Sequence, residues 1–139
     1  MLLLQKQAVR LISGNGYLEP TLPIFLELKI IPIVLQFKIN KLILIYKSTV
    51  GLTPAYISEK FSTFVNNVNS HATRAGIDEK IYLPAYKSQY AKSFEITGIK
   101  IWNSIPKNIR SSATLAVFKR TLKIYVFHKL SSFACTSDI

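Results

Sequence analysis

The chain has 139 residues, which suffice for one domain with a modest core and give no reason to expect two. Apolar residues make up 49% and aromatic residues 12%, so the composition excludes a wholly disordered, fibrous or low-complexity chain. The 18 Lys and Arg residues against 7 Asp and Glu give a net charge of +11, which favours a polyanionic partner such as RNA or DNA.

Helical spacing of apolar residues dominates the first half of the sequence. We expect helices over residues 2–13, 22–28, 33–50 and 55–64. Gly14 and Gly51 end the first and third of these, and Pro32 and Pro54 precede the third and fourth. The apolar stripe of the first helix consists of Leu4, Ala8, Leu11 and Ile12. The third helix is apolar nearly all round, which is typical of a buried helix, so this half is expected to supply most of the core.

The second half follows a polar loop over residues 66–80. Residues 81–84 and 93–96 are β-branched and aromatic, which predicts a short two-stranded β-ribbon. Residues 98–104 suggest a turn of helix, and a last helix is expected over residues 115–128 with Thr114 as its N-cap. The predicted fold is a mainly α, single small helical domain over residues 1–130, with a helical half (1–65), the loop, a ribbon-plus-helix half (81–130) and a flexible tail (131–139).

Several functional classes lack support in the sequence. The apolar stretch from Ile30 to Tyr46 has Lys38 and Lys41 near its centre, so no membrane span and no membrane partner are expected. A single cysteine, Cys135, suits a reducing compartment, and with two histidines it gives no zinc-ligand spacing. We therefore expect no catalytic residues, no metal, no cofactor and no small-molecule substrate. We also expect an intracellular protein, nuclear or cytoplasmic, that is not secreted.

The segment from Gly98 to Lys123 is the best candidate for a nucleic-acid contact, because no Asp or Glu occurs between residues 96 and 137. Phosphate contacts from Lys and Arg need no special geometry and are independent of base sequence. The candidate backbone-contacting residues are Lys100, Lys107, Arg110, Lys119, Arg120 and Lys123. The alternative is an ordinary solvated helix face. Tyr and Phe residues between the lysines mostly follow core spacing and are assigned to the core.

Two further groups of residues have competing interpretations. His71 and Arg74 in the polar loop either bind a phosphate or hold the loop to the domain, and the sequence favours neither. Trp102 offers a face for base stacking, but its neighbours favour a core indole bonded to a nearby carbonyl. Gly98 is expected to permit close packing or an unusual backbone angle, and Pro106 to turn the chain.

A series of short motifs, each different from the others, extends along nearly the whole chain. They are Leu4–Ile12, Thr21–Phe25, Leu28, Ile30, Pro32, Tyr46–Lys47, Leu52–Pro54, Phe61, Ser70–His71, Thr73–Arg74, Leu83–Pro84, Lys92–Phe94, Gly98, Trp102–Asn103, Ile105–Pro106, Ile109–Arg110, Phe118–Lys119 and Leu122–Lys123. In their order and spacing they resemble the segment that follows the polymerase region in jockey-like non-LTR retrotransposon reverse transcriptases. By this resemblance Gly98, Trp102, Asn103, Pro106 and Phe118 are structural residues of the family pattern.

The resemblance implies a role in a larger enzyme, an RNA-directed DNA polymerase. The family's catalytic motif, an aromatic residue followed one position later by Asp-Asp, has no counterpart here, so the chain is expected to be catalytically inert. Met1 falls within the family pattern, which suggests a truncated copy or a shortened reading frame. The implied partners are RNA or DNA, bound without sequence preference, and the missing polymerase domain. The alternatives are a purely structural module that packs on the polymerase, an independent small nucleic-acid-binding protein, and a degenerate fragment without activity.

Overall fold

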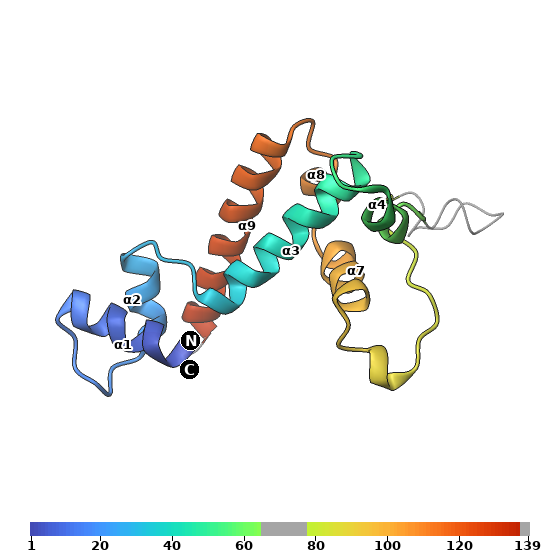
Figure 1. Cartoon of the computed structure of the whole chain (residues 1–139). Helices are drawn as coiled ribbons and strands as arrows, with labels where there is room; N and C mark the ends of the chain where they lie inside the picture. Colours follow the sequence, from blue (N-terminus) through green and yellow to red (C-terminus); the bar gives the residue numbers. More distant parts are fainter. Residues whose placement is uncertain (65–77, 137–139) are drawn as a thin grey trace. The chain divides into compact units, whose positions relative to one another are not determined.

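The protein is seen here in a computed structural model that describes residues 1–64 and 78–136, with side chains up to residue 131. These residues are mainly helical (Figure 1). The elements are α1 (Leu2–Ser13), α2 (Thr21–Glu27), α3 (Ile33–Thr49), α4 (Ala55–Phe61), the 3-10 turn η1 (Ser88–Tyr90), α7 (Phe94–Ser104), α8 (Lys107–Arg110) and α9 (Leu115–Thr136).

The chain forms two compact units. The terminal unit comprises Met1–Ile39 and the described chain from Arg120 onward, and the central unit comprises the described residues of Asn40–Lys119. The division falls within α3 and within α9, and not at the polar loop. Residues from both of the expected halves therefore combine in the central unit, and among the described residues the second half contributes as many core residues as the first.

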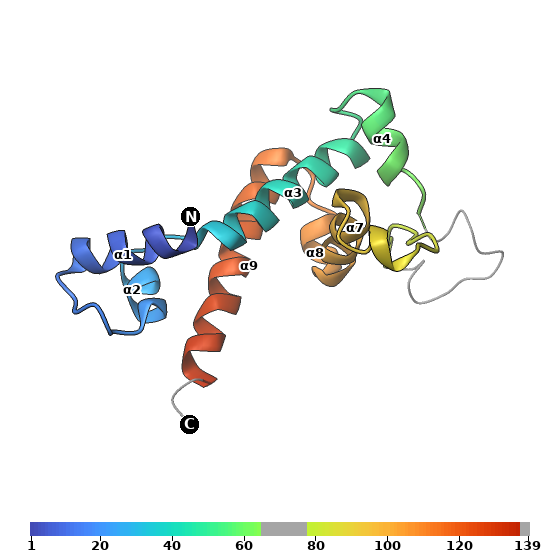
Figure 2. The ribbon, with the colours of Figure 1, turned by 60° about the horizontal axis from the view of Figure 1, so that its bottom comes forward.

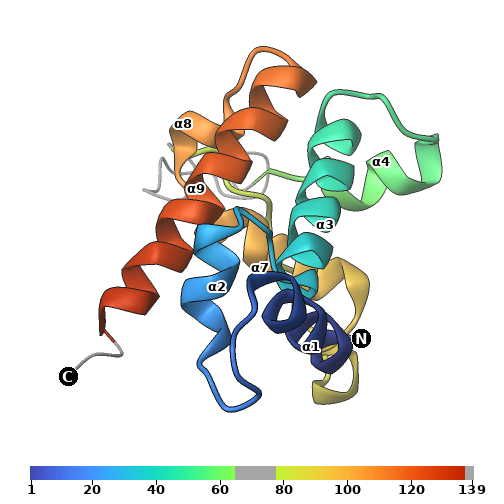
Figure 3. The same cartoon turned by 90° about the vertical axis from the view of Figure 1, so that its left-hand side faces the viewer.

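In the terminal unit α1 and α2 pack side by side (Figures 1 and 3). Their small core consists of Val9, Ile24 and Phe25, against which Leu28 and Ile30 pack. The Gln5 side chain fixes the chain that follows α2, because its amide accepts a hydrogen bond from the Ile33 amide (2.8 Å) and donates one to the Ile31 carbonyl (3.3 Å).

The apolar stripe expected on α1 does not face this core. Val9 is the buried residue of the helix, whereas Leu4 is 68% exposed, Leu11 85% and Ile12 67%. The helix itself has the expected bounds, because Gly14 adopts a left-handed conformation (φ 70°) that ends it. The periodicity therefore predicts the helix, but α1 presents an apolar face that no described residue of its own unit covers.

The core of the central unit is built around three aromatic side chains. Tyr46 of α3 stacks on Phe118 of α9 with ring centroids 4.3 Å apart, and Trp102 of α7 lies 6.0 Å from Phe118. All three are buried, and the Tyr46 hydroxyl donates a hydrogen bond to the Ser112 carbonyl (2.7 Å). Trp102 is thus a core residue, but no described residue accepts a hydrogen bond from its Nε1, in contrast to the carbonyl partner expected from sequence.

Close contact between α3 and α7 is possible because Gly98 has no side chain. A Cβ atom at this position would lie 3.0 Å from Ile45 Cδ1 on α3. Next to this contact Lys41 reaches along α7, where its Nζ donates to Thr97 Oγ1 (2.6 Å) and lies 4.9 Å from the centroid of the Phe94 ring. Gly98 therefore has ordinary helical geometry, and close packing explains its lack of a side chain.

The predicted two-stranded ribbon is wrong, because residues 1–64 and 78–136 contain an isolated Phe64–Ile81 bridge but no β-strand. The second expected strand, residues 93–96, is the start of α7: Ser93 is its N-cap and accepts a hydrogen bond from the Ile96 amide. From Ile96 the buried residues recur at helical spacing, at Ile99 and Trp102, and not at every second position.

The last helix begins as expected and ends later. Thr114 caps it by accepting a hydrogen bond from the Val117 amide (3.3 Å), which confirms the expected N-cap. Its end is at Thr136 and not near His128, so residues 131–136, expected to belong to a flexible tail, are helical.

We predict that Gly98→Val lowers the free energy of unfolding by about 1–3 kcal/mol, because the added atoms force α3 and α7 apart. Urea denaturation followed by circular dichroism measures the change. Gly16→Val is the matched control, since a Cβ there meets its nearest atom, Glu19 Oε1, at 3.9 Å. Equal stability of the two variants would contradict the proposed close contact.

Candidate nucleic-acid interface

Three of the six candidate cations lie on α9, in one stretch of five residues. Lys119, Arg120 and Lys123 are all exposed, and Lys119 and Lys123 are one helical turn apart. Within the terminal unit Lys123 also borders a mostly apolar hollow of about 420 Å³ that Leu26 and Phe127 help to line. These three side chains have the exposure that phosphate contacts require.

Two more candidates are exposed in the central unit. Lys100 of α7 places its Nζ 4.8 Å from the centroid of the Tyr86 ring, a cation–π contact. Lys107 at the start of α8 has its Nζ 3.8 Å from Glu79 Oε1, and both side chains are about half exposed. An exposed pair at this distance stabilises the fold by less than about 1 kcal/mol, so the Lys107 charge remains accessible to a polyanion.

Arg110 differs from the other five candidates because it is only 8% exposed. Its guanidinium donates hydrogen bonds to the carbonyls of Asp78 (2.7 Å), Trp102 (3.4 Å) and Asn103 (3.5 Å). Burial lowers the pKa of the guanidinium from its ordinary value, and the nearby Asp78 and Glu79 carboxylates oppose this shift. Arg110 therefore caps the C-terminal end of α7 and holds residues 78–81 against it, and it does not fit an exposed phosphate-binding surface.

The Asn103 side chain substitutes for a β-strand partner. Its Oδ1 accepts a hydrogen bond from the Ile81 amide (3.0 Å) and its Nδ2 donates one to the Ile81 carbonyl (2.8 Å). This pairing explains why Ile81 is buried without a ribbon. Pro106, the N-cap of α8, separates α7 from α8, and the two helices lie close together (Figures 1 and 2). Of the family-pattern residues, Gly98, Trp102 and Asn103 all lie on α7, and Trp102 contacts Phe118 of α9.

Other expected features of the site are placed differently. His71 and Arg74 lie outside the described residues. In the described part of the chain no group of three or more His, Cys, Asp or Glu side chains is arranged to hold a metal ion. None of the helices in the described ranges has the length and apolar character that crossing a bilayer requires.

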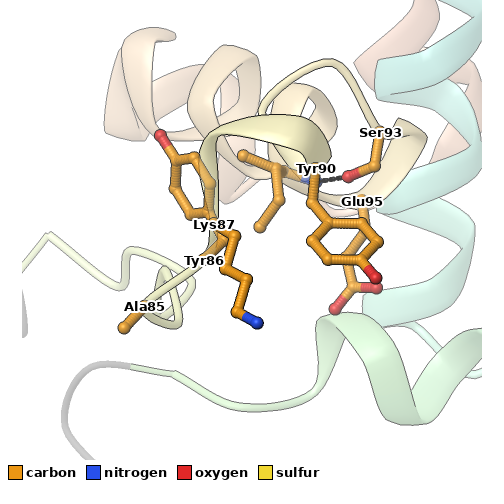
Figure 4. Close-up of a pocket in the computed structure, with 7 residues that line it drawn as sticks. Ala85, Tyr86, Lys87, Tyr90, Ser93 and Glu95 are labelled. Atoms are coloured by element: carbon orange, nitrogen blue, oxygen red, sulfur yellow. Dashed lines mark hydrogen bonds between the residues drawn. The ribbon is translucent and has the colours of Figure 1, made fainter.

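A hollow in the central unit was not expected from the sequence. It has a volume of about 370 Å³ and lies beside η1 and the first turn of α7 (Figure 4). Its lining residues are Ala85, Tyr86, Lys87, Tyr90, Ser93, Glu95 and Ile96. The available signal was the alternation of Tyr and Lys from Tyr86 to Lys92. Neither ring belongs to the buried core, because Tyr86 is 37% exposed and Tyr90 56%.

Comparisons of this chain with protein-family models, with curated proteins and with solved structures found no match.

We predict that Arg110→Met lowers the free energy of unfolding by about 1–3 kcal/mol, because the buried carbonyls at the end of α7 lose their donor. Lys107→Met, in the same short helix, should cost less than about 1 kcal/mol because its ion pair is exposed. Thermal or urea unfolding of both variants measures the difference. Similar losses for the two variants would contradict the capping role of Arg110.

Proposed function

We propose that this chain is a non-catalytic accessory segment that binds nucleic-acid backbone without sequence preference. The observation that supports the proposal most is the exposure of Lys119, Arg120 and Lys123 on α9, in a stretch of sequence without acidic residues from 96 to 137. With no carboxylate nearby in sequence to neutralise them, these cations attract phosphates and release the counterions of the nucleic acid when they bind.

The resemblance of the sequence motifs supplies the context for this binding. The chain acts downstream of the polymerase region of a non-LTR retrotransposon reverse transcriptase, in an intracellular setting, nuclear or cytoplasmic. There it holds template RNA or the primer–template duplex by its backbone. The polymerase domain supplies the catalytic aspartates, and the chain itself contributes affinity and positioning.

A second candidate function is a structural module that packs on the polymerase. The exposed stripe of α1 favours it: Leu4, Leu11 and Ile12 are each at least two-thirds exposed. An apolar face of this kind, one helix long, is typical of a surface that another protein covers. The two functions are compatible, because the stripe on α1 and the cations on α9 involve different residues.

We predict that changing Lys119, Arg120 and Lys123 together to Gln flattens the salt dependence of binding. The slope of log K against log salt should fall by about 2–3 units, because each phosphate that is no longer neutralised lowers it by about 0.7–0.9. Binding of the purified chain to a labelled single-stranded RNA and to a matched duplex, from about 50 to 200 mM salt, measures the slope.

A triple variant that removes the same number of positive charges outside α9 is the control for this measurement. Lys29, Lys38 and Lys47 changed to Gln should alter the slope less than the α9 variant does. The Arg110→Met variant should leave the slope unchanged if it remains folded. Absence of binding at low salt, from a chain that circular dichroism shows to be folded, would refute nucleic-acid binding and leave the structural module or a fragment without activity.

We also predict that Leu4→Lys combined with Leu11→Lys changes the free energy of unfolding by no more than about 0.5 kcal/mol, because both side chains are already exposed. Val9→Lys in the same helix should cost at least about 2 kcal/mol, since it buries a charge. Urea unfolding measures both, and binding of an apolar dye should decrease in the double variant. A large loss of stability in the double variant would show that the stripe is part of the core.

A further inference from the structure

The hollow beside the first turn of α7 has the features of a site for a flat, polar molecule. Figure 4 shows Lys87 and Tyr90 extending from their segment on the same side as the Glu95 carboxylate. Its volume of about 370 Å³ is at the lower end of the range for small-molecule sites. All of its lining residues belong to the central unit.

Tyr90 provides a stacking surface. The residue is 56% exposed, and no aromatic or cationic group of the described residues stacks on its ring. Solvent-exposed tyrosines next to lysines are the groups on which single-stranded nucleic acids stack their bases, since every base has a π face. A duplex, whose bases are already stacked on one another, cannot use this surface.

Glu95 determines which part of a nucleotide the hollow accepts. Its Oε2 pairs with Lys60 Nζ (3.1 Å), and its other carboxylate oxygen takes no hydrogen bond from the described residues. A carboxylate repels a phosphate but accepts a hydrogen bond from the exocyclic amino group of a base. At the N-terminal end of α7, the Ile96 amide already donates to Ser93 Oγ and is not available to a phosphate. The hollow therefore favours a base over a phosphate.

The phosphates on either side of such a base have cations available to them. Lys87 lines the hollow, Lys92 follows η1 and is exposed, and the Lys100 ammonium lies over the Tyr86 ring. When a single strand stacks one base on Tyr90, the phosphates next to that base therefore lie near these lysines. The combination of an aromatic face, a carboxylate and surrounding lysines distinguishes this site from the purely electrostatic contacts of α9.

We infer that this hollow is a binding site for one unpaired nucleobase that carries an exocyclic amino group, within single-stranded RNA or DNA. The inference rests on the proposed function, which it extends from backbone contact to contact with a base. Uracil and thymine have no exocyclic amino group and present a carbonyl oxygen where cytosine and adenine present one, so they bind less well.

The experiment compares wild-type chain, Tyr90→Ala and Tyr56→Ala by fluorescence anisotropy. Tyr56 is the matched control because it is an exposed tyrosine of the same unit that does not line the hollow. The probes are oligocytidine, oligouridine, their DNA counterparts, and an abasic strand of equal length that keeps every phosphate. Tyr90→Ala should weaken binding to oligocytidine about 5- to 150-fold, the effect of losing one base–aromatic stack.

The other measurements separate a binding role of the hollow from a structural one. Tyr56→Ala should bind like wild type, Tyr90→Phe should retain most of the affinity, and the abasic strand should bind Tyr90→Ala and wild type equally. Glu95→Gln should reduce the preference for oligocytidine over oligouridine, because an amide can also donate to uracil. Circular dichroism establishes that each variant is folded.

The outcomes distinguish failure of the site from failure of the proposed function. If wild type binds with a salt-dependent affinity but Tyr90→Ala binds oligocytidine equally well, the base site is refuted and backbone binding stands. The base site is also refuted, and backbone binding also stands, if wild type binds oligocytidine and the abasic strand with equal affinity. If folded wild type binds no strand at about 50 mM salt, both proposals are refuted.

Discussion

The central unit depends on one aromatic cluster, in which Tyr46, Trp102 and Phe118 join α3, α7 and α9. Stacked and tilted aromatic pairs contribute about 0.5–1.5 kcal/mol each beyond the burial of their area. The Tyr46 hydroxyl extends the cluster to the Ser112 carbonyl just before α9. Gly98 lets α7 approach α3 closely enough for the cluster to form. Because α7 is fixed in this way, its two ends are fixed as well, one at the hollow and the other at the Arg110 cap.

Local signals in the sequence predicted the helices well but failed where a side chain replaced backbone pairing. The end of α1 was predictable because Gly14 readily adopts a left-handed conformation. The ribbon was not, because residues 93–96 have strand-like composition, whereas the Ser93 cap and the spacing of buried residues after Ile96 favour a helix. Nothing in the local sequence shows that Asn103 pairs with the Ile81 backbone, since the two residues are 22 positions apart.

The candidate site was predictable in charge but not in exposure. Composition located the basic stretch, yet Lys107 is exposed and Arg110, three residues later in the same helix, is buried as a helix cap. Helical periodicity also cannot tell which apolar stripe faces a core, so the exposure of Leu11 on α1 required the structure. The exposure of Tyr90 likewise depends on the turn η1, which brings it beside α7. The described residues thus include an exposed apolar stripe on α1, exposed cations on α9 and an exposed tyrosine, Tyr90, beside lysines in the central unit.

The most direct test of the proposed nucleic-acid interface is photo-cross-linking of the wild-type chain to a single-stranded RNA that carries 5-iodocytidine, with the cross-linked peptides mapped by mass spectrometry. We expect cross-links in two segments, residues 85–96 around Tyr90 and residues 119–123 of α9, and their disappearance at high salt. A matched duplex should retain only the contacts of α9. Cross-links confined to the apolar stripe of α1, or none from folded protein at low salt, would contradict the proposed interface.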